Sequence, residues 1–471
     1  MPQPQPSNFP INRRTMLVAS AAGMQAVSTS RADSSAVTGG KARSTILFFL
    51  CGGSSHIDMW DMKPEAPLEY RGPFQPIGTS APDLQISEHL PLVAKQAHHL
   101  SLIRSVRASV NTNDHHAGYY YNLTGHVPDQ TFLSQGNNRR PYSDDWPYMG
   151  SVVAARRPRH ASLPNAISLP HMPSRRPYTR PGQFSARLGL QFDPLYLQGS
   201  RDEPLRFSAP ALELQAGTDA GRLSDRSQLL TALDQARRRF DTDQKASTFT
   251  QQQERAFSLL SSANTTSAFD VAAEPPALRQ RYGETVNGMS LLLARRLVEA
   301  EVPFITVFWL GHGVNTPLAK KCRSAGSWDT HGNNFGCLKD DLLPEFDRCF
   351  SALVEDLAQR NLLDQTTLLV TSEMGRKPKI GDPRSGGQSG AGRDHWTHIQ
   401  TNVVAGGGIQ GGRIYGSSDR LGEFPADKPV TPAHVAHTVY HAMGVTDLRD
   451  RDTQGRPYPL LEEGEPLYEL F

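Results

Sequence analysis

The chain has 471 residues, of which 38% are hydrophobic and 20% charged, a composition that supports a large buried core and excludes disorder throughout. Its 49 basic and 47 acidic residues give a formal net charge of only +2, so nothing in the charge balance favours binding to nucleic acid. Large α/β folds of this length are often one domain, and we expect a single domain over residues 41–471.

The first forty residues resemble an export signal. The stretch NRRTML at 12–17 is typical of a twin-arginine start, and a weakly apolar stretch follows at 18–27. An unstructured N-terminal tail is the alternative. We expect residues 1–40 to be an export signal and linker, which predicts a periplasmic or extracellular protein. No later segment reaches the roughly 18 consecutive apolar residues of a membrane span, so we expect no stable span.

Along the rest of the chain, short β-rich runs alternate with helical patterns, which predicts a doubly wound, mostly parallel sheet between helical layers. The predicted strands are 45–50, 100–105, 303–310, 367–371 and 401–405. Helices are predicted where apolar residues recur at spacings of three and four, at 90–98, 227–240, 284–301 and 338–360, and after Pro432. Residues 127–220 are rich in Pro, Arg and Ser without clean periodicity. We expect an irregular insertion there, which would form a lid over a site.

The four cysteines show no CxxC spacing, which argues against a zinc ribbon. In an oxidising compartment Cys322 and Cys337 could bridge the loop between them. Cys51 ends a predicted strand and reads as a buried small hydrophobe.

Histidines and carboxylates cluster in turns that follow predicted strands or begin helices. These turns are GGSSHIDMWD at 52–61, NDHH at 113–116, SWDTHGNN at 327–334, TSEMGR at 371–376 and GRDHW at 392–396. Because an α/β sheet presents its active site at the carboxyl edge of its strands, we expect these distant turns to meet there. His, Asp and Glu side chains are ordinary metal ligands, so the pattern predicts a metal-dependent hydrolase site.

Each turn also has a structural explanation when taken alone. The Gly-Gly-Ser turn before Asp58 is a common β-to-α connection, and Glu373 at the end of a buried strand could simply pair with Arg376. Asp394 beside His395 can be two ligands, or a ligand and the group that orients it. Several such turns at predicted strand edges together favour a site.

Longer stretches of the chain resemble the bacterial domain-of-unknown-function family 1501, and through it the alkaline phosphatase and sulfatase superfamily. They run from about residue 45 to about residue 445 and are LFFLCGGSSHIDMWDMKP, GPFQPIGTS, SEHLPLVAK, NDHHAGYYYNLTG, SWDTHGNNF, LLDQTTLLVTSEMGR, GRDHW and VVAGGGIQGGRIYG. The resemblance implies an alkaline-phosphatase-like α/β fold in which two zinc or similar ions activate a nucleophile and bind a phosphate or sulfate ester.

By this resemblance, Asp329, His331 and His395 are the counterparts of the first-metal ligands, although the Asp-to-His spacing is shorter than usual. Asp394 precedes His395 and is a further candidate ligand.

For the second metal, Glu373 takes the place of the superfamily's Asp, and Met374 takes the place of its His. Because the first strand ends in Gly52-Gly53, Asp58 or His56 would have to supply the remaining ligand. The resemblance therefore implies a second site that is altered or missing.

The nucleophile departs from the superfamily as well. Asp114, His115 and His116 begin a predicted helix where the family pattern has Asp-Ser, so His115 stands in the place of the attacking serine. A histidine can attack phosphorus or bind a metal, but a metal-activated water is an equal alternative. Arg376 or Arg393 would balance the charge of an anionic substrate.

The sequence thus predicts an exported, metal-dependent hydrolase of a small-molecule or polysaccharide phosphate or sulfate ester. The alternative is a degenerate superfamily member that binds an anionic polysaccharide or a partner protein without turnover. We expect a divalent metal, with zinc favoured and manganese, iron or calcium as alternatives, since His and carboxylate ligands accept all of them. The substrate and the oligomeric state are left open.

Overall fold

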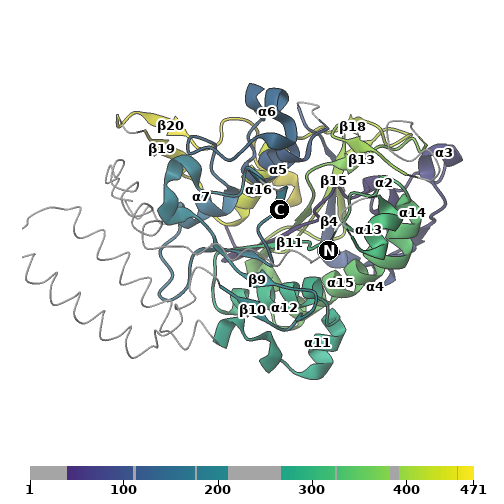
Figure 1. The fold of residues 1–471 in the computed structure, drawn as a ribbon, viewed down its shortest axis with the longest axis horizontal. Helices are drawn as coiled ribbons and strands as arrows, with labels where there is room; N and C mark the ends of the chain where they lie inside the picture. Colours follow the sequence, from purple (N-terminus) through teal and green to yellow (C-terminus); the bar gives the residue numbers. More distant parts are fainter. Residues whose placement is uncertain are drawn as a thin grey trace, which may run out of the picture.

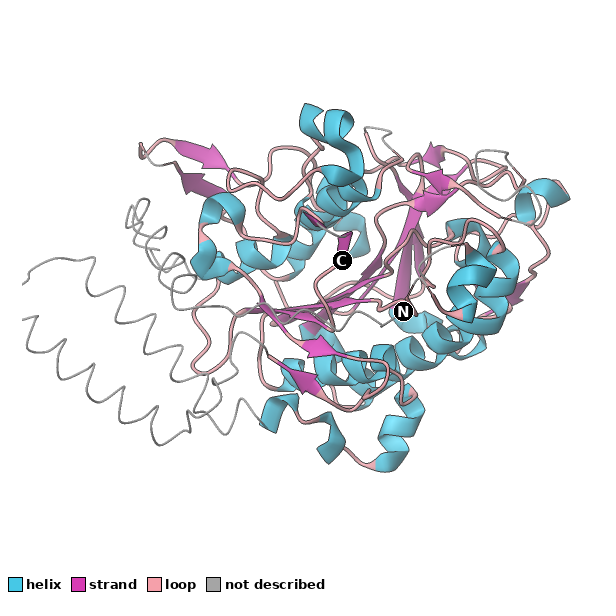
Figure 2. Cartoon of the chain, in the orientation of Figure 1, coloured by secondary structure: helices cyan, strands magenta, loops and turns pink. Residues whose placement is uncertain are grey.

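The computed structural model describes residues 40–109, 113–175, 178–209, 267–313, 315–323, 326–381, 392–452 and 454–471. A mixed sheet of eight strands crosses the molecule, with helices on both of its faces (Figures 1 and 2). The expected export signal and linker over residues 1–40, apart from Gly40, and the predicted helix at 227–240 lie outside the described residues.

All five strands predicted from the sequence belong to this sheet. Its order is β16 (Arg413–Tyr415), β4 (Leu100–Val106), β15 (Gln400–Ala405), β12 (Thr366–Thr371), β1 (Ser44–Phe49), β11 (Phe304–Phe308), β5 (Ala166–Leu169) and β8 (Leu195–Tyr196). Neighbouring strands are parallel except where β15 pairs with β12 and β4. The predicted mostly parallel α/β sheet is therefore confirmed.

The central strands are buried along their whole length because helices cover both faces of the sheet. Every residue of β1 is buried, and Ile46 lies beside Ile305 of β11 and Leu368 of β12. Continuous burial of this kind is typical of parallel strands.

The helical layers place α11 (Pro276–Tyr282), α12 (Val286–Glu299) and α15 (Leu343–Gln359) on one face of the sheet, and α5 (His115–Thr124), α7 (Met149–Arg156) and α16 (Pro432–Ala442) on the other (Figure 1). The predicted helix at 338–360 begins with one π-helical turn at Leu338–Leu342. The predicted helix at 90–98 is divided into α4 (Pro91–Ala94) and a 3₁₀ turn at Ala97–His99.

The smaller elements lie mainly in the connections. The short helices are α2 (His56–Met59), α3 (Leu68–Arg71), α6 (Gln130–Gln135), α13 (Pro317–Cys322) and α14 (Asn334–Cys337). The two-stranded pairs are β2 (Pro76–Gly78) with β3 (Gln85–Ser87), β6 (Ser174–Arg175) with β7 (Tyr178–Thr179), β9 (Gln198–Gly199) with β10 (Phe207–Ser208), β13 (Gly375–Arg376) with β14 (His395–Trp396), β17 (Ser417–Ser418) with β18 (Pro425–Asp427), and β19 (Arg449–Arg451) with β20 (Pro457–Pro459).

The segment 127–220, expected to be an irregular insertion, is irregular over much of its described length. It also supplies β5 and β8, which extend the main sheet beside β11, and α7, which packs against β5 and β11. Both strands are too short for a period-two pattern to reveal them. None of the helices in the described ranges is long and apolar enough to cross a membrane.

An aromatic cluster joins the sheet to α15 and to the loop after β11. Phe346 is fully buried and lies 5.8 Å from the ring of Phe48, 5.9 Å from that of Trp60 and 5.8 Å from that of Trp328. Trp328 immediately precedes Asp329, so core packing sets the position of that loop.

Replacing Phe346 by Ala should lower the free energy of unfolding by about 3–5 kcal/mol, because a fully buried ring leaves a cavity that its aromatic neighbours cannot fill. Chemical denaturation measures the loss. Leu190→Ala, at a side chain that is 65% exposed, is the control and should change stability by less than about 0.5 kcal/mol. Equal small effects at both positions would contradict the packing described here.

Candidate metal centre

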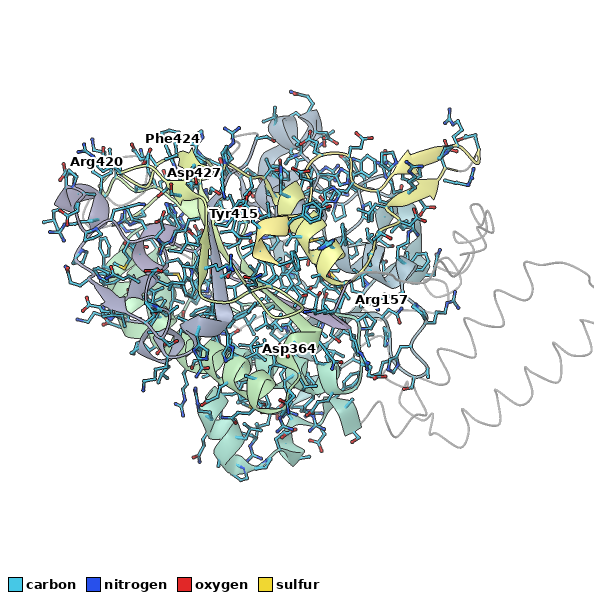
Figure 3. All side chains as sticks on the ribbon, turned by 180° about the vertical axis from the view of Figure 1, so that it is seen from behind. Arg157, Asp364, Tyr415, Arg420, Phe424 and Asp427 are labelled. Atoms are coloured by element: carbon cyan, nitrogen blue, oxygen red, sulfur yellow. A yellow bond between two sulfur atoms is a disulfide. The ribbon has the colours of Figure 1, made fainter. Side chains whose placement is uncertain are left out.

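The turns singled out in the sequence meet at the carboxyl edge of the sheet. β1 leads into Gly52, β12 leads into Glu373, and β4 leads toward Asp114 at the start of α5. β15 runs antiparallel, so the residue that comes before it, His395, reaches the same edge from the opposite direction. Figure 3 shows the two ends of the sheet, with Asp364 just before β12 at one end and Phe424 and Asp427 toward the other.

Pairing of β13 with β14 brings two of the turns together. Arg376 lies opposite His395 in this antiparallel pair. Adjacent residues of a strand point to opposite faces, so His395 faces the cluster of histidines and carboxylates while Trp396 packs on Phe424. Phe424 lies at the outside of the molecule (Figure 3).

Three side chains converge on one point at this edge. The distance from His331 Nε2 to Asp329 Oδ1 is 2.8 Å, that from His395 Nε2 to Asp329 Oδ1 is 3.1 Å, and the two Nε2 atoms are 3.1 Å apart. These are the three residues that the family resemblance assigns to the main ion. Edges of this length are close to those between the ligands of a tetrahedral zinc ion, whose bonds are about 2.0–2.2 Å long.

The partners of the two Nδ1 atoms determine whether each Nε2 atom carries a proton or a lone pair. His395 Nδ1 is 2.8 Å from the backbone carbonyl of Asn113, which can only accept, so Nδ1 carries the proton and Nε2 presents a lone pair. His331 Nδ1 faces Asp394 Oδ1 at 3.6 Å, which favours the same tautomer. Burial lowers the pKa of His395, so this ring is neutral at neutral pH. Lone pairs that converge in this way are stabilised by a cation.

His115 approaches the same carboxylate from the start of α5. Asp114 caps this helix by accepting a hydrogen bond from Ala117 N at 3.1 Å, which fixes the first turn. His115 Nδ1 is then 2.9 Å from Glu373 Oε1, and His115 Nε2 is 3.4 Å from Asp329 Oδ2. The nitrogen and oxygen atoms of His115, Asp329 and His395 also lie close enough together to hold one metal ion.

The electrostatics of His115 follow from its two carboxylate partners. Burial alone would lower its pKa, but Asp329 and Glu373 outweigh burial and raise it. In return, burial would raise the pKa values of both carboxyls, but Arg376 and His115 hold that of Asp329 well below its usual range, and His115 lowers that of Glu373. The two carboxylates therefore favour the protonated form of His115, which does not suit the nucleophile expected from the sequence.

Arg376 is wholly buried and is used by the protein itself. Its guanidinium contacts Asp329 Oδ1 and donates to the carbonyls of Gly52, Gly53 and Trp328. We expected Arg376 to balance the substrate's charge. The structure instead gives it the role of fixing the Asp329 carboxylate.

The expected substrate role of Arg393 is likewise wrong. Arg393 pairs with Asp58 through Nε to Oδ2 at 2.7 Å and Nη2 to Oδ1 at 2.9 Å, with both side chains fully buried. Its remaining N–H groups donate to the carbonyls of Tyr70, Lys377 and Pro378. No N–H group is left for a substrate.

The structure therefore also corrects the metal role expected for Asp58. Its carboxylate is already satisfied by Arg393, by Ser55 Oγ at 2.6 Å and by Asn334 Nδ2 at 2.7 Å. His56 is buried with Nε2 2.9 Å from the carbonyl of Gly422. Neither residue belongs to a possible ligand group among the described residues, and the same holds for Glu373, which orients His115 instead.

His116 points away from His115. It is fully buried, and its Nδ1 lies 2.9 Å from the carbonyl of Arg139. Because successive helical residues diverge by about 100°, only one of the two adjacent histidines can face Asp329. The expected catalytic role of His116 alongside His115 is not supported.

A glycine and a disulfide allow the loop after β1 and the loop of Asp329 to approach each other closely. Gly52 N donates to Glu373 Oε1 at 2.8 Å, and a Cβ on Gly52, at φ +125°, would lie 2.3 Å from Asp329 N. The expected bridge between Cys322 and Cys337 is present and closes the loop that carries Asp329 and His331. The contribution of the Asn113 carbonyl could not have been foreseen, because a backbone atom leaves no signature in the sequence.

A family model described as a protein of unknown function (DUF1501) matches residues 42–471. The chain belongs to this family. No curated protein of similar sequence was found.

Solved structures with a similar fold include three enzymes of low sequence identity. The phosphonate monoester hydrolase SpPMH from Silicibacter pomeroyi has a TM-score of 0.41 and 11% identity, over 90% of this chain and 76% of that chain. The PsFucS1 sulfatase from Pseudoalteromonas sp. has a TM-score of 0.37 and 12% identity, over 86% and 68%. The alkaline phosphatase from the Antarctic bacterium TAB5 has a TM-score of 0.32 and 11% identity, over 86% and 100%.

The buried Asp58 carboxylate should depend strongly on its partner Arg393 for the stability of the fold. We expect Arg393→Met to lower the free energy of unfolding by about 3–5 kcal/mol, because the Asp58 carboxylate would stay buried without its cation. The matched control is Arg456→Met, which breaks the ion pair of a 75%-exposed arginine with Asp452 and should cost no more than about 1 kcal/mol. Similar losses in urea denaturation for both variants would refute the buried pair.

The raised pKa of His115 makes a prediction about pH in metal-free protein. A group whose pKa is higher in the folded state stabilises the fold below its unfolded value of about 6.5, and this contribution is lost as pH rises through the folded value. Denaturation of chelator-treated wild type and His115→Gln should therefore show a stability difference that is largest below pH 6.5 and shrinks at higher pH. A difference that grows with pH would contradict the imidazolium.

Proposed function

We propose that this protein is an exported, metal-dependent hydrolase of a phosphate or sulfate ester. The observation that carries the proposal is the convergence of Asp329 Oδ1, His331 Nε2 and His395 Nε2 within 3.1 Å of one another. The carbonyl of Asn113 orients the His395 ring. Zinc suits such a donor set best, with manganese and iron as alternatives, whereas the two nitrogen donors argue against calcium.

One ion suffices for the proposal. Among the described residues, His395 belongs to the convergence with Asp329 and His331, to the group with His115 and Asp329, and to the group with His331 and Asp394. A single ring nitrogen binds one ion at a time, so these groups describe one site. On the other side of His115, Met374 is buried and offers no ligand comparable to a histidine, while Asp58 is committed to Arg393. A divalent cation bound at Asp329 would polarise the ester and activate a water molecule for attack.

The surrounding residues have distinct roles in this proposal. Arg376 fixes the carboxylate of Asp329, and the Asn113 carbonyl fixes the ring of His395. Glu373, itself held by Gly52 N, orients His115. As an imidazolium, His115 can donate a proton to the departing oxygen of the ester, in place of the nucleophilic attack expected from the sequence.

A non-catalytic binding protein is the second candidate. The absence of a serine at the start of α5 favours it, since His115 occupies that position and is engaged by two carboxylates. Both candidates share the twin-arginine pattern at 12–17, which supports export. They differ in turnover, so metal content and hydrolysis must be measured on the same protein.

Elemental mass spectrometry of the protein purified without added metal should find about one equivalent of a divalent metal, since the converging donors form one site. His331→Ala with His395→Ala should lose this metal, and hydrolysis of 4-nitrophenyl phosphate or sulfate should fall by about 100-fold or more. The control is His98→Ala with His99→Ala, a second pair of touching histidine rings at the amino edge of β4.

Two results would count against this proposal. Metal that persists in the His331 and His395 variant would show that the ion binds elsewhere. Stoichiometric metal in wild type without hydrolysis of any ester tested would favour the binding protein.

A further inference from the structure

Arg180 carries a charge that the described structure does not pair. Its Nη1 is buried without a hydrogen-bond partner, and its guanidinium lies 4.7 Å from the ring centre of Tyr119. The carboxyl on which its charge acts is that of Glu373, which is already engaged by His115 Nδ1 at 2.9 Å. Removing a guanidinium from water without a partner is costly, so a buried N–H group of this kind points to a ligand.

Helix geometry places this guanidinium beside the candidate metal centre. Tyr119 follows His115 by one turn of α5, so the two side chains share a face of the helix. The chain around Arg180 lies directly on that helix, because a Cβ on Gly182 would be 2.7 Å from Tyr120 Cα. The positive charge of Arg180 also contributes to lowering the pKa of Glu373, after that of His115.

His116 supplies a second unpartnered atom next to Arg180. Its Nδ1 faces the Arg139 carbonyl and must donate to it, so the neutral ring presents Nε2 as an acceptor. That Nε2 is buried and has no hydrogen-bond partner.

His171, just after β5, completes the surroundings. Its Nδ1 is a third buried nitrogen without a hydrogen-bond partner, and burial followed by the charge of Arg180 lowers its pKa to about 4. The three unpartnered nitrogens thus belong to residues from α5, from the segment after β5 and from the segment after β7, all close to one cation.

We propose that Arg180 and His116 form an anion subsite that selects a hydrogenphosphate over a sulfate. Arg180 donates to an anionic oxygen, and His116 Nε2 accepts the hydrogen bond of a P–OH group. Inorganic phosphate carries at least one hydroxyl at every pH from 5 to 9, whereas sulfate carries none and would set its oxygen against the lone pair of His116. This inference rests on the proposed function. It assigns the inorganic product of that hydrolysis, and through it the ester, to the phosphate branch.

The test is calorimetric titration of the full-length protein, as purified and again after chelation, with inorganic phosphate and with sulfate. Wild type should bind phosphate about tenfold or more tightly than sulfate. Phosphate donates a hydrogen bond to His116 Nε2, whereas sulfate sets an oxygen against the same lone pair. Arg180→Met should lose binding of both anions. His116→Gln, which can turn an amide N–H toward the subsite, should bring the two affinities close together.

The matched control is Arg140→Met. Arg140 comes from the same segment, and its exposed guanidinium also lies over a tyrosine ring, that of Tyr178 at 4.5 Å. This variant should keep the wild-type affinities. Thermal denaturation without anions separates a ligand role from a structural one, because removing an unpaired charge should leave the melting temperature of Arg180→Met unchanged or higher.

Equal or tighter binding of sulfate by wild type would overturn the selectivity. A lower melting temperature of Arg180→Met with anion binding intact would overturn the subsite and make Arg180 a structural residue. Absence of binding of either anion would also overturn it, leaving a bridging water as the partner of both nitrogens. The titration of chelated protein separates the two proposals. Anion binding that survives chelation supports the subsite whether or not the metal proposal holds.

Discussion

The carboxylate of Asp329 is the group on which the site depends. Arg376, His115, His331 and His395 all contact it, and they come from four different segments of the chain. A partly buried carboxylate is unfavourable unless cations and donors surround it, so the energy that holds Asp329 charged also holds these segments together. The same arrangement points the lone pairs of two histidine nitrogens toward one carboxylate oxygen. These lone pairs repel one another, and a bound metal ion would relieve that repulsion.

The fold supplies this geometry in layers. Parallel strands deliver Gly52 and Glu373 to one edge, and the antiparallel β15 lets His395 reach that edge from the opposite direction. Trp328, packed on Phe346, anchors the loop of Asp329 to the core, and the buried Cys322–Cys337 disulfide closes the same loop. Rigid supports of this kind keep ligands within the narrow limits that metal binding needs.

Much of this was predictable because it depends on local patterns. Five strands were found from their apolar runs, and the edge of the sheet followed from the rule for α/β folds. The residues Asp329, His331 and His395 were identified by resemblance, and the structure brings them together. The short strands β5 and β8 escaped because a run of two to four residues has no periodicity.

Roles within the site were harder to predict than its location, because they depend on partners distant in the sequence. Arg393 could be recognised as a cation near the site, but its pairing with Asp58, 335 residues away, is a tertiary contact that no spacing reveals. The choice between His115 and His116 depends on the rotation of α5 about its axis. Arg180 drew no attention because one arginine among many in an irregular segment carries no pattern.

The most direct test of the account is a crystal soaked with zinc and measured at the zinc absorption edge. The account predicts a single strong anomalous peak about 2.0–2.2 Å from Asp329 and from the Nε2 atoms of His331 and His395. A peak located elsewhere, or none at these residues in the presence of zinc, would contradict it.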